Sequence, residues 1–169
     1  DDGDFKNRKI IVADALIDSV VKECELKNYK KIFKFKGKEL KNTICSHPFL
    51  NLGYNHDIPL LNARFVTTDQ GTGIVHCAPS HGPDDFNLCL NNGIKAVETV
   101  DGDGKYTNNV KLFEGIHIFK ANPIIIEKLK EQKNLLSNGE LVHSYPHSWR
   151  SKAPLVHRAT PQWFISMES

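Results

Sequence analysis

A dense group of Gly, His, Pro and Asp residues lies in the middle of the chain, over residues 71–86. The run reads Gly-Thr-Gly-Ile-Val-His-Cys-Ala-Pro-Ser-His-Gly-Pro-Asp-Asp-Phe. Glycine allows tight turns and the close approach of a ligand to the backbone. Imidazole groups exchange protons near neutral pH, and carboxylates bind cations through charge-assisted hydrogen bonds. Because this composition is a poor way to build a hydrophobic core, the run is the candidate functional site.

The elements expected around this run place a histidine and an aspartate at the rims of one pocket. Ile74 and Val75 are β-branched and favour a strand that ends at His76. Pro83 suits the first position of a helix, because its missing N–H would be unpaired there anyway. Asp85 then falls in the first helical turn, where a carboxylate also complements the helix dipole. Structural roles alone for the aspartate and the histidine are therefore the alternative to chemistry.

Length and charge place the chain among ordinary globular domains. Its 169 residues are enough for one domain with a sizeable core. The chain has 22 Lys and Arg residues and 20 Asp and Glu residues. This nearly neutral net charge argues neither for nor against an RNA partner. No run has the length of a membrane span, and no signal peptide opens the chain. Since the first residue is not Met, we expect a fragment of a longer cytoplasmic protein.

The cysteines show no spacing that is typical of a metal site. The four residues lie far apart and lack any Cys-x-x-Cys pair; they are Cys24, Cys45, Cys77 and Cys89. Reduced thiols in a cytoplasmic protein are the simplest expectation.

Short strands and a few helices are expected along the chain. A strand over 9–13 leads to a helix that Asp14 can cap. Alternation predicts a half-buried strand over 30–36, with Phe33 and Phe35 on its inner side. Other short strands are expected over 60–67, 96–100, 141–145 and 155–158, and near Leu135. This pattern predicts a mixed α/β fold in which a closed or partly closed β-barrel carries peripheral helices.

Two further local signals are a turn and a helix start. Residues 101–104 read Asp-Gly-Asp-Gly, but the twelve-residue pattern and the closing Glu of a calcium loop are absent. A plain turn is therefore expected. Asn122 can cap a second amphipathic helix that starts at Pro123.

One charge run stands out, and it has two interpretations. It consists of seven lysines, at positions 27, 30, 31, 34, 36, 38 and 41. A solvated face is one interpretation, and a surface that meets nucleic-acid phosphates is the other. With both phenylalanines expected to point inward, no aromatic platform for bases is expected beside the lysines.

The run over 71–86 resembles the signature of the editing domain that is inserted in bacterial class I isoleucyl-tRNA synthetases. The run His143-Ser-Tyr-Pro-His-Ser-Trp-Arg-Ser-Lys-Ala-Pro-Leu-Val-His-Arg-Ala-Thr-Pro-Gln-Trp-Phe-Ile-Ser-Met167 resembles the segment by which these enzymes return to the catalytic core. Weaker similarity occurs at His47-Pro-Phe49, before the first run, and at Phe119-Lys-Ala-Asn122, between the two runs. The resemblance thus covers nearly the whole chain, as a single domain over 1–169 with a returning segment over 143–169. It implies a β-barrel-like editing domain of short strands.

The resemblance implies a hydrolytic activity that preserves the fidelity of translation. The reaction is the hydrolysis of mischarged Val-tRNA(Ile), with the valyl-adenylate as a second substrate. The implied partners are the tRNA(Ile) acceptor end, the misacylated valine and the rest of the parent synthetase. The parent joins isoleucine to tRNA(Ile) with ATP and Mg²⁺ in a synthetic site outside this chain. No cofactor or metal is therefore expected in this domain.

The resemblance also implies roles for individual residues. Asp85 occupies the position credited with binding the α-ammonium group of the substrate. His76 occupies the position that shapes the side-chain pocket and orients the substrate, and it points to the isoleucyl branch, because the valyl and leucyl enzymes usually lack it. Imidazole suits a general base by its pKa, but the family often assigns the positioning of water to the neighbouring ribose hydroxyl. Both roles of the histidine therefore stay open.

Other residues of the run are expected to bind substrate. Gly71, Thr72 and Gly73 form the opening turn that the family shares. Ser80 and His81 are expected to contact the terminal adenosine of the tRNA.

The sequence departs from the family in two ways. A threonine-rich peptide with a neighbouring Trp forms one wall of the pocket in the family, and Thr67 and Thr68 lie too close to the glycine turn to be that peptide. We therefore expect activity to depend on a segment upstream. The His-Ile-Gly-His and Lys-Met-Ser-Lys-Ser types of nucleotide signature are also absent, so this chain is not expected to activate isoleucine.

Two alternatives belong to other functional classes. One is a module that binds the tRNA acceptor end without catalysis. The other is a metal-dependent hydrolase, whose candidate ligands are His76, His81, Asp84 and Asp85. Their spacing fits no helical zinc motif.

Overall fold

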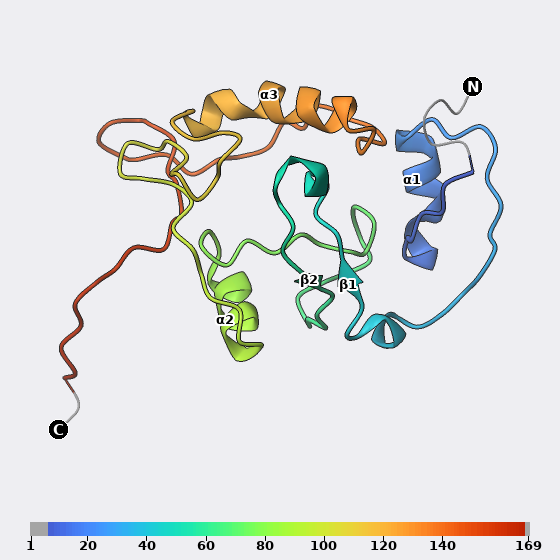
Figure 1. Cartoon of the computed structure of the whole chain (residues 1–169), viewed down its shortest axis with the longest axis horizontal. Coiled ribbons are helices and arrows are strands. Elements are labelled where there is room, and N and C mark those ends of the chain that lie inside the picture. Colours follow the sequence, from blue (N-terminus) through green and yellow to red (C-terminus); the bar gives the residue numbers. More distant parts are fainter. Residues whose placement is uncertain (1–6, 168–169) are drawn as a thin grey trace. The chain divides into compact units, whose positions relative to one another are not determined.

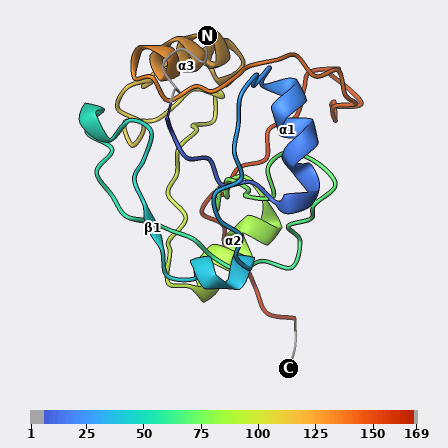
Figure 2. The same ribbon diagram turned by 90° about the vertical axis from the view of Figure 1, so that its right-hand side faces the viewer.

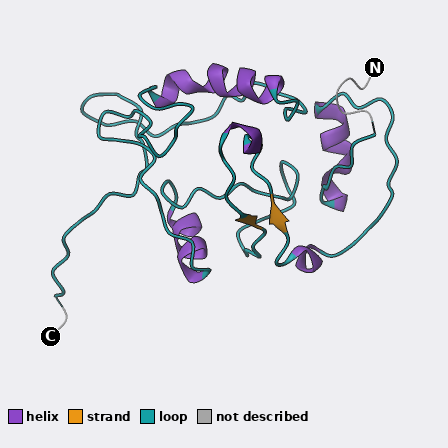
Figure 3. Cartoon of the chain, viewed as in Figure 1, coloured by secondary structure: helices purple, strands orange, loops and turns teal. Residues whose placement is uncertain are grey.

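The computed structural model describes residues 7–167, and most of their backbone is irregular (Figure 3). The helices are α1 (Ile17–Glu23), α2 (Pro83–Asn91) and α3 (Ile118–Glu131), and the strands are β1 (Ile44–Cys45) and β2 (Ile58–Pro59) (Figure 1). Short 3-10 helices lie at Asp14–Leu16, Gly37–Leu40 and Leu50–Leu52. No helix within residues 7–167 has both the length and the apolar character of a membrane span.

The contacts within the chain define two compact units. The first unit contains the residues up to 76 together with 122–141, and the second unit contains 77–121 and the residues from 142 onward. The prediction of a single domain over 1–169, with a returning segment from 143, stays a prediction.

In the first unit, α1 and the 3-10 turn before it each bury one apolar side chain. Leu16 and Val20 are buried, whereas the neighbouring Ile17 is partly exposed. The helix is preceded by a 3-10 turn, and Asp14 does not cap it. The carboxylate of Asp14 instead accepts hydrogen bonds from Lys31 Nζ at 2.5 Å and Lys34 Nζ at 2.7 Å. The predicted capping role is therefore wrong, because the carboxylate is taken by lysines that are distant in sequence.

The sheet described within residues 7–167 is a short open pair of strands. β1 and β2 are antiparallel, with Ile44 opposite Pro59 and Cys45 opposite Ile58. The bond from Leu60 N–H to Thr43 O, 2.9 Å long, extends the pairing by one step. Because Pro59 has no N–H to donate, the ladder cannot continue in the usual way along this strand. The mixed α/β character is confirmed, and the predicted closed β-barrel is wrong.

The segment that links α1 to β1 is irregular apart from the 3-10 helix Gly37–Leu40, and it can be followed in Figures 1 and 2. The predicted strand over 30–36 is absent from it, and Phe33 is 74% exposed. The ring of Phe33 lies 5.8 Å from that of Phe35. Without a neighbouring strand, the alternation of apolar residues has no sheet face to occupy. The inward orientation expected for Phe33 is therefore wrong.

Other predicted strands are also irregular. Residues 9–13 and 60–67 form no strand, although Ala13 N–H donates to Thr72 O at 2.8 Å. Residues 96–100 contribute a single bridge between Val100 and Tyr106, while 141–145 and 155–158 form no strand of their own. Within residues 7–167, none of these segments pairs with a partner over two or more successive residues, which a ladder requires.

In the second unit, two local predictions are confirmed. α2 begins at Pro83, as expected for a proline at the first helical position. Residues 101–104 form a turn closed by the bond from Gly104 N–H to Asp101 O at 3.2 Å. The buried apolar residues of this unit include Val100, Phe113 and Ala121.

The third helix starts before the predicted proline. α3 begins at Ile118, and Pro123 lies inside it. The Nδ1 atom of His117 accepts a hydrogen bond of 3.3 Å from the N–H of Phe119 and so satisfies one of the first backbone donors. The start expected at Pro123 is therefore wrong, because this cap lies further upstream.

Candidate functional site

Asp85 lies in the first turn of α2, where the loop before the helix fixes its side chain. Gly82 is extended and precedes Pro83, so that Asp84 and Asp85 fall in the first turn. The Oδ2 atom of Asp85 accepts a hydrogen bond of 2.8 Å from Ala78 N–H. Asp85 is half-buried, whereas Asp84 is exposed. The two neighbouring carboxylates therefore have different surroundings, and only Asp85 is built into the loop.

Two thiols lie around the Asp85 carboxylate, and the sequence analysis did not assign them to the site. Burial raises the pKa of the Cys77 thiol, and the negative charge of Asp85 raises it further. Burial also raises the pKa of Cys89, again with a contribution from Asp85. Both thiols are therefore protonated near neutral pH. The spacing of Asp85 and Cys89, one helical turn apart, is the signal that could have revealed this pair.

The four cysteines form no disulfide in the described part of the chain. All four lie within the described part of the chain, and each is a free thiol. The thiol of Cys77 is half-buried and that of Cys89 is buried.

Ser80 joins the loop to two other segments of the second unit. Its side chain is 6% exposed, and its hydroxyl donates to Val97 O at 2.5 Å. Its carbonyl oxygen accepts from Ala159 N–H at 2.7 Å. In this arrangement Ser80 positions the loop, and its predicted contact with adenosine stays a prediction.

Both ring nitrogens of His81 are engaged by the same two segments. Nδ1 lies 2.8 Å from His157 O, and Nε2 lies 2.7 Å from Thr99 Oγ1. A carbonyl oxygen only accepts, so Nδ1 carries the proton, and Nε2 accepts from the threonine hydroxyl in the neutral ring. His81 thereby attaches its end of the loop to Thr99 and His157. The bond from Ala78 N–H to Asp85 attaches the loop to the helix. The predicted contact of His81 with adenosine also stays a prediction.

The glycine turn lies in the first unit and approaches another segment closely. Gly71 and Gly73 have φ angles of +69° and +78°, which favour glycine. A Cβ atom added to Gly73 would lie 2.5 Å from Ala13 Cβ. Thr72 Oγ1 donates to Ile74 O at 3.1 Å. The turn thus has the close backbone approach that its glycines predicted, although the neighbour is a segment of the protein.

His76 is exposed, and the strand expected before it is absent. Residues 74 and 75 are irregular and exposed. In the first unit, His76 is one of a group of three histidines. Burial lowers the pKa of His47, and the neighbouring His56 and His76 lower it further.

His47 forms the ordered centre of this group. Its ring stacks on Tyr54 with centroids 4.7 Å apart and lies 5.6 Å from the ring of His56. Its Nδ1 atom accepts from Phe49 N–H at 3.0 Å, so the neutral ring is the form that fits. Sequence similarity at residues 47–49 was the only signal for this arrangement.

The candidate residues are therefore divided between the two units. Asp85, Ser80 and His81 belong to the second unit, and His76 and the glycine turn belong to the first. The pocket that His76 and Asp85 are expected to share stays a prediction. Over residues 7–167, the His, Cys, Asp and Glu side chains include no group of three or more arranged to hold a metal.

Comparisons with known proteins identify relatives of the whole chain. It is 82% identical over 169 residues to the isoleucine–tRNA ligase of Pelagibacter ubique (strain HTCC1062), with all of this chain and 19% of that protein covered. It is 44% identical over 165 residues to the isoleucine–tRNA ligase of Hahella chejuensis (strain KCTC 2396), covering 98% of this chain and 17% of that protein. For the isoleucine–tRNA ligase of Gluconobacter oxydans (strain 621H), the identity is 43% over 171 residues, covering 95% and 18%. No family model matches the chain.

The chain is thus similar to a segment of these aminoacyl-tRNA synthetases. More narrowly, its homologues are isoleucine–tRNA ligases, and the chain corresponds to a segment of about a fifth of their length. This agrees with the family resemblance of residues 71–86 and 143–167.

Proposed function

We propose that this chain is the editing part of an isoleucine–tRNA ligase and hydrolyses mischarged Val-tRNA(Ile). In the reaction the oxygen of a water molecule forms a bond to the valyl carbonyl carbon. The ester bond to the ribose oxygen breaks, and that oxygen takes up a proton. Valine and free tRNA(Ile) are the products, and valyl-adenylate is a second substrate of the same kind. The proposal concerns this reaction and not the activation of isoleucine.

The placement of Asp85 is the observation that carries the proposal. Its carboxylate is held by Ala78 N–H, and a carboxylate has more acceptor sites than this one bond uses. The substrate carries a free α-ammonium group, which a fixed carboxylate binds through a charge-assisted hydrogen bond. The protonated thiols of Cys77 and Cys89 add no competing charge beside it. The site therefore fits a cationic group attached to a small apolar side chain.

We assign His76 to the side-chain pocket that accepts valine. Its exposed imidazole is accessible to substrate. The water that attacks the ester is oriented by the ribose hydroxyl next to the ester, and His76 is the alternative base. Gly71, Thr72 and Gly73 supply backbone that closes around the substrate. A bulkier side chain at position 76 should change which amino acid is accepted.

The partners in this proposal follow from the length of the relatives. The chain spans about a fifth of each ligase, so the rest of the synthetase presents the acceptor end of tRNA(Ile). ATP and Mg²⁺ act in the synthetic site of the parent, outside this chain. The proposed setting is translation in the cytoplasm.

The test compares two neighbouring carboxylates in the full-length ligase. Asp85→Ala should lower the rate of Val-tRNA(Ile) deacylation roughly 10- to 100-fold, the loss expected for one charged hydrogen bond. Asp84→Ala is the matched control, because Asp84 is exposed in the same helical turn, and its rate should stay within about twofold of the parent. Aminoacylation with isoleucine should be unchanged in both variants. Deacylation by Asp85→Ala at the parental rate would contradict the proposal.

The lysine run favours a second candidate, a module that binds the acceptor end without hydrolysing it. All seven lysines between residues 27 and 41 are exposed, and Phe33 is exposed among them. Cations beside an exposed aromatic ring are typical of surfaces that bind single-stranded nucleic acid. Binding and turnover of Val-tRNA(Ile), measured on one sample, separate the candidates. Binding without turnover in the full-length ligase would favour the binding module.

A further inference from the structure

The lysine segment, residues 27–41, concentrates positive charge on the first unit. It carries seven lysines against a single acidic residue, Glu39. All seven lysine side chains are exposed. Within residues 7–167, the ion pairs of these lysines both involve one carboxylate, that of Asp14. Asp14 is therefore the group that limits what the lysine segment can offer to an anion.

Asp14 is held by two lysines at once. Its Oδ1 atom lies 2.5 Å from Lys31 Nζ, and its Oδ2 atom lies 2.7 Å from Lys34 Nζ. The hydrogen bonds from these lysines, that from Lys31 first, lower the pKa of Asp14 to about 2, so the carboxylate is charged at neutral pH. Two ammonium groups on two oxygens of one anion also suit a phosphate group. The carboxylate thus occupies the place that a phosphate would take.

The two sides of this contact are anchored to different degrees. Ala13 N–H donates to Thr72 O at 2.8 Å, and Leu16 is buried, so the backbone on both sides of Asp14 is fixed. In contrast, residues 27–35 make no backbone–backbone hydrogen bond with the described part of the chain. A segment without such bonds opens at a low cost in free energy. A ligand that takes the lysines therefore moves the lysine segment and leaves Asp14 in place.

Exposed aromatic rings lie among the lysines. Tyr29 is 57% exposed and Phe33 is 74% exposed. Lysines interleaved with exposed rings favour a single-stranded nucleic acid, because the ammonium groups follow the phosphates while the rings stack on bases. A lipid surface fits less well, because the backbone N–H and C=O groups of residues 27–35 need water as their partner.

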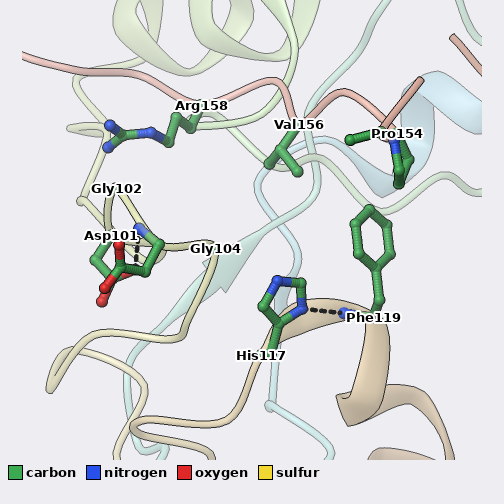
Figure 4. Close-up of a pocket in the computed structure, with 10 residues that line it drawn as sticks. Asp101, Gly102, Gly104, His117, Phe119, Pro154, Val156 and Arg158 are labelled. Atoms are coloured by element: carbon green, nitrogen blue, oxygen red, sulfur yellow. Dashed lines mark hydrogen bonds between the residues drawn. The ribbon is translucent and has the colours of Figure 1, made fainter. Parts of the chain in front are cut away.

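The pocket beside the turn at 101–104, in the second unit, is a poorer site for a phosphate. Asp101 and Asp103 line it together with a single guanidinium, that of Arg158. Figure 4 shows this guanidinium directed away from His117 on the other side of the pocket. Because two carboxylates repel an anion, the lysine segment fits a phosphate better than this pocket does.

We propose that the lysine segment binds the phosphate backbone of single-stranded RNA, and that Asp14 is an internal competitor which the RNA displaces from Lys31 and Lys34. In the unbound chain, the carboxylate masks two of the seven positive charges. In the complex, phosphate groups occupy both ammonium groups, and the rings of Tyr29 and Phe33 stack on bases. Because one anion is exchanged for another, binding is weaker than seven unmasked lysines would give. The inference concerns the first unit and does not rest on hydrolysis at Asp85.

The first test measures fluorescence anisotropy of a labelled oligouridylate of about ten nucleotides with the 169-residue chain. Asp14→Asn should tighten binding roughly threefold or more at about 0.1 M salt, because it removes the competitor. Asp18→Asn is the matched control, since Asp18 is exposed and has no ion pair within residues 7–167. It removes the same charge and should change the affinity less than about twofold. Equal effects of the two variants would overturn the role of Asp14.

The salt dependence tests whether the two lysines pass from Asp14 to the RNA. For a single strand, the logarithm of the affinity falls against the logarithm of the salt concentration with a slope of about 0.7 for each phosphate contacted. Lys31→Met/Lys34→Met should therefore make the slope shallower by about 1.4, and Asp14→Asn should no longer tighten binding in this background. Lys38→Met/Lys41→Met, the control pair, should weaken binding but keep the effect of Asp14→Asn. A slope that Lys31→Met/Lys34→Met leaves unchanged would overturn the displacement.

Two further measurements test the kind of partner. Phe33→Leu should weaken binding of the oligouridylate without changing the slope, because it removes a stacking ring and no charge. Phosphatidylglycerol vesicles at the same phosphate concentration should bind the unmodified chain more weakly than the RNA does. Tighter binding to the vesicles, or no saturable binding of RNA at about 0.1 mM protein, would overturn the proposal.

Circular dichroism confirms that each variant is folded, and the measurements on the unmodified chain do not depend on any variant. Deacylation of Val-tRNA(Ile) is measured separately in the full-length ligase. The failure of one proposal is therefore distinguishable from the failure of the other.

Discussion

The backbone N–H of Ala78 donates a hydrogen bond of 2.8 Å to Asp85 Oδ2, seven residues further along the chain. This bond joins the loop before α2 to the first turn of the helix. The carboxylate therefore has two roles, since it orders the loop and supplies the charge proposed to bind an ammonium group. Substitutions that remove one role at a time can separate them.

Asp85→Asn should keep the loop ordered but remove the negative charge proposed to bind the substrate. The amide oxygen can still accept from Ala78 N–H, but the negative charge is gone. We expect hydrogen exchange of the Ala78 amide to stay close to that of the unmodified chain in Asp85→Asn and to become at least about tenfold faster in Asp85→Ala. NMR measures this exchange. If both variants exchange alike, Asp85 does not order the loop.

Gly73→Ala should destabilise the first unit. The added Cβ would lie 2.5 Å from Ala13 Cβ, and φ is +78° at this position. We expect the free energy of unfolding in urea to fall by roughly 1–3 kcal/mol. Gly37→Ala is the control, because it has no positive φ and nothing within 4 Å of its added Cβ. An equal effect of the two substitutions would contradict the close approach of residues 13 and 73.

The sequence predicted the features whose causes lie within a few residues. The start of α2 at Pro83 and the turn at 101–104 depend on proline and glycine chemistry, and both were found. The predicted β-barrel was not found, because each strand of a barrel must pair with another strand that can lie far away in the sequence. Phe33 shows the difference, since its alternating pattern has no adjacent strand and its ring is exposed.

The candidate site shows the same limit. Asp85 could be predicted from its place after Gly82 and Pro83, and its position in the first turn of α2 was found. The partners of His81, in contrast, are Thr99 and His157, which lie 18 and 76 residues away. No local pattern encodes contacts over such separations. The positioning role of this histidine therefore became visible only in the structure.

Ser80→Ala should destabilise the second unit. It removes the buried hydroxyl that donates to Val97 O and leaves this carbonyl without that donor. We expect a loss of about 1–3 kcal/mol in the free energy of unfolding. Ser19→Ala is the control, because Ser19 Oγ donates to Glu23 on the exposed surface of α1, and its loss should stay within about 0.5 kcal/mol. A Ser80→Ala variant as stable as the control would show that the bond to Val97 does not hold the loop.

Asp14 should titrate at unusually low pH. Hydrogen bonds from Lys31 and Lys34, together with their charges, lower the pKa of Asp14 to about 2 from 3.8. Because the pKa is lowered in the folded state, the stabilisation is present above pH 3.8 and is lost as the pH falls toward 2. NMR titration of the Asp14 carboxyl measures this. The double variant Lys31→Met/Lys34→Met should return the titration midpoint of Asp14 toward 3.8. The control Lys38→Met should not move this midpoint. An unchanged midpoint in the double variant would contradict the pairing of Asp14 with the two lysines.

The Cys77 thiol should report the charge of Asp85. Burial and the Asp85 carboxylate both raise its pKa, so little reactive thiolate forms near pH 8. In Asp85→Asn the charge is lost while the side-chain size is kept, and alkylation of Cys77 by iodoacetamide should become severalfold faster. Mass spectrometry of the peptide that contains Cys77 measures the rate. Asp84→Asn changes the same charge on the exposed neighbour and should leave the rate unchanged; if both variants accelerate alkylation equally, the effect is one of net charge and the thiol does not lie beside Asp85.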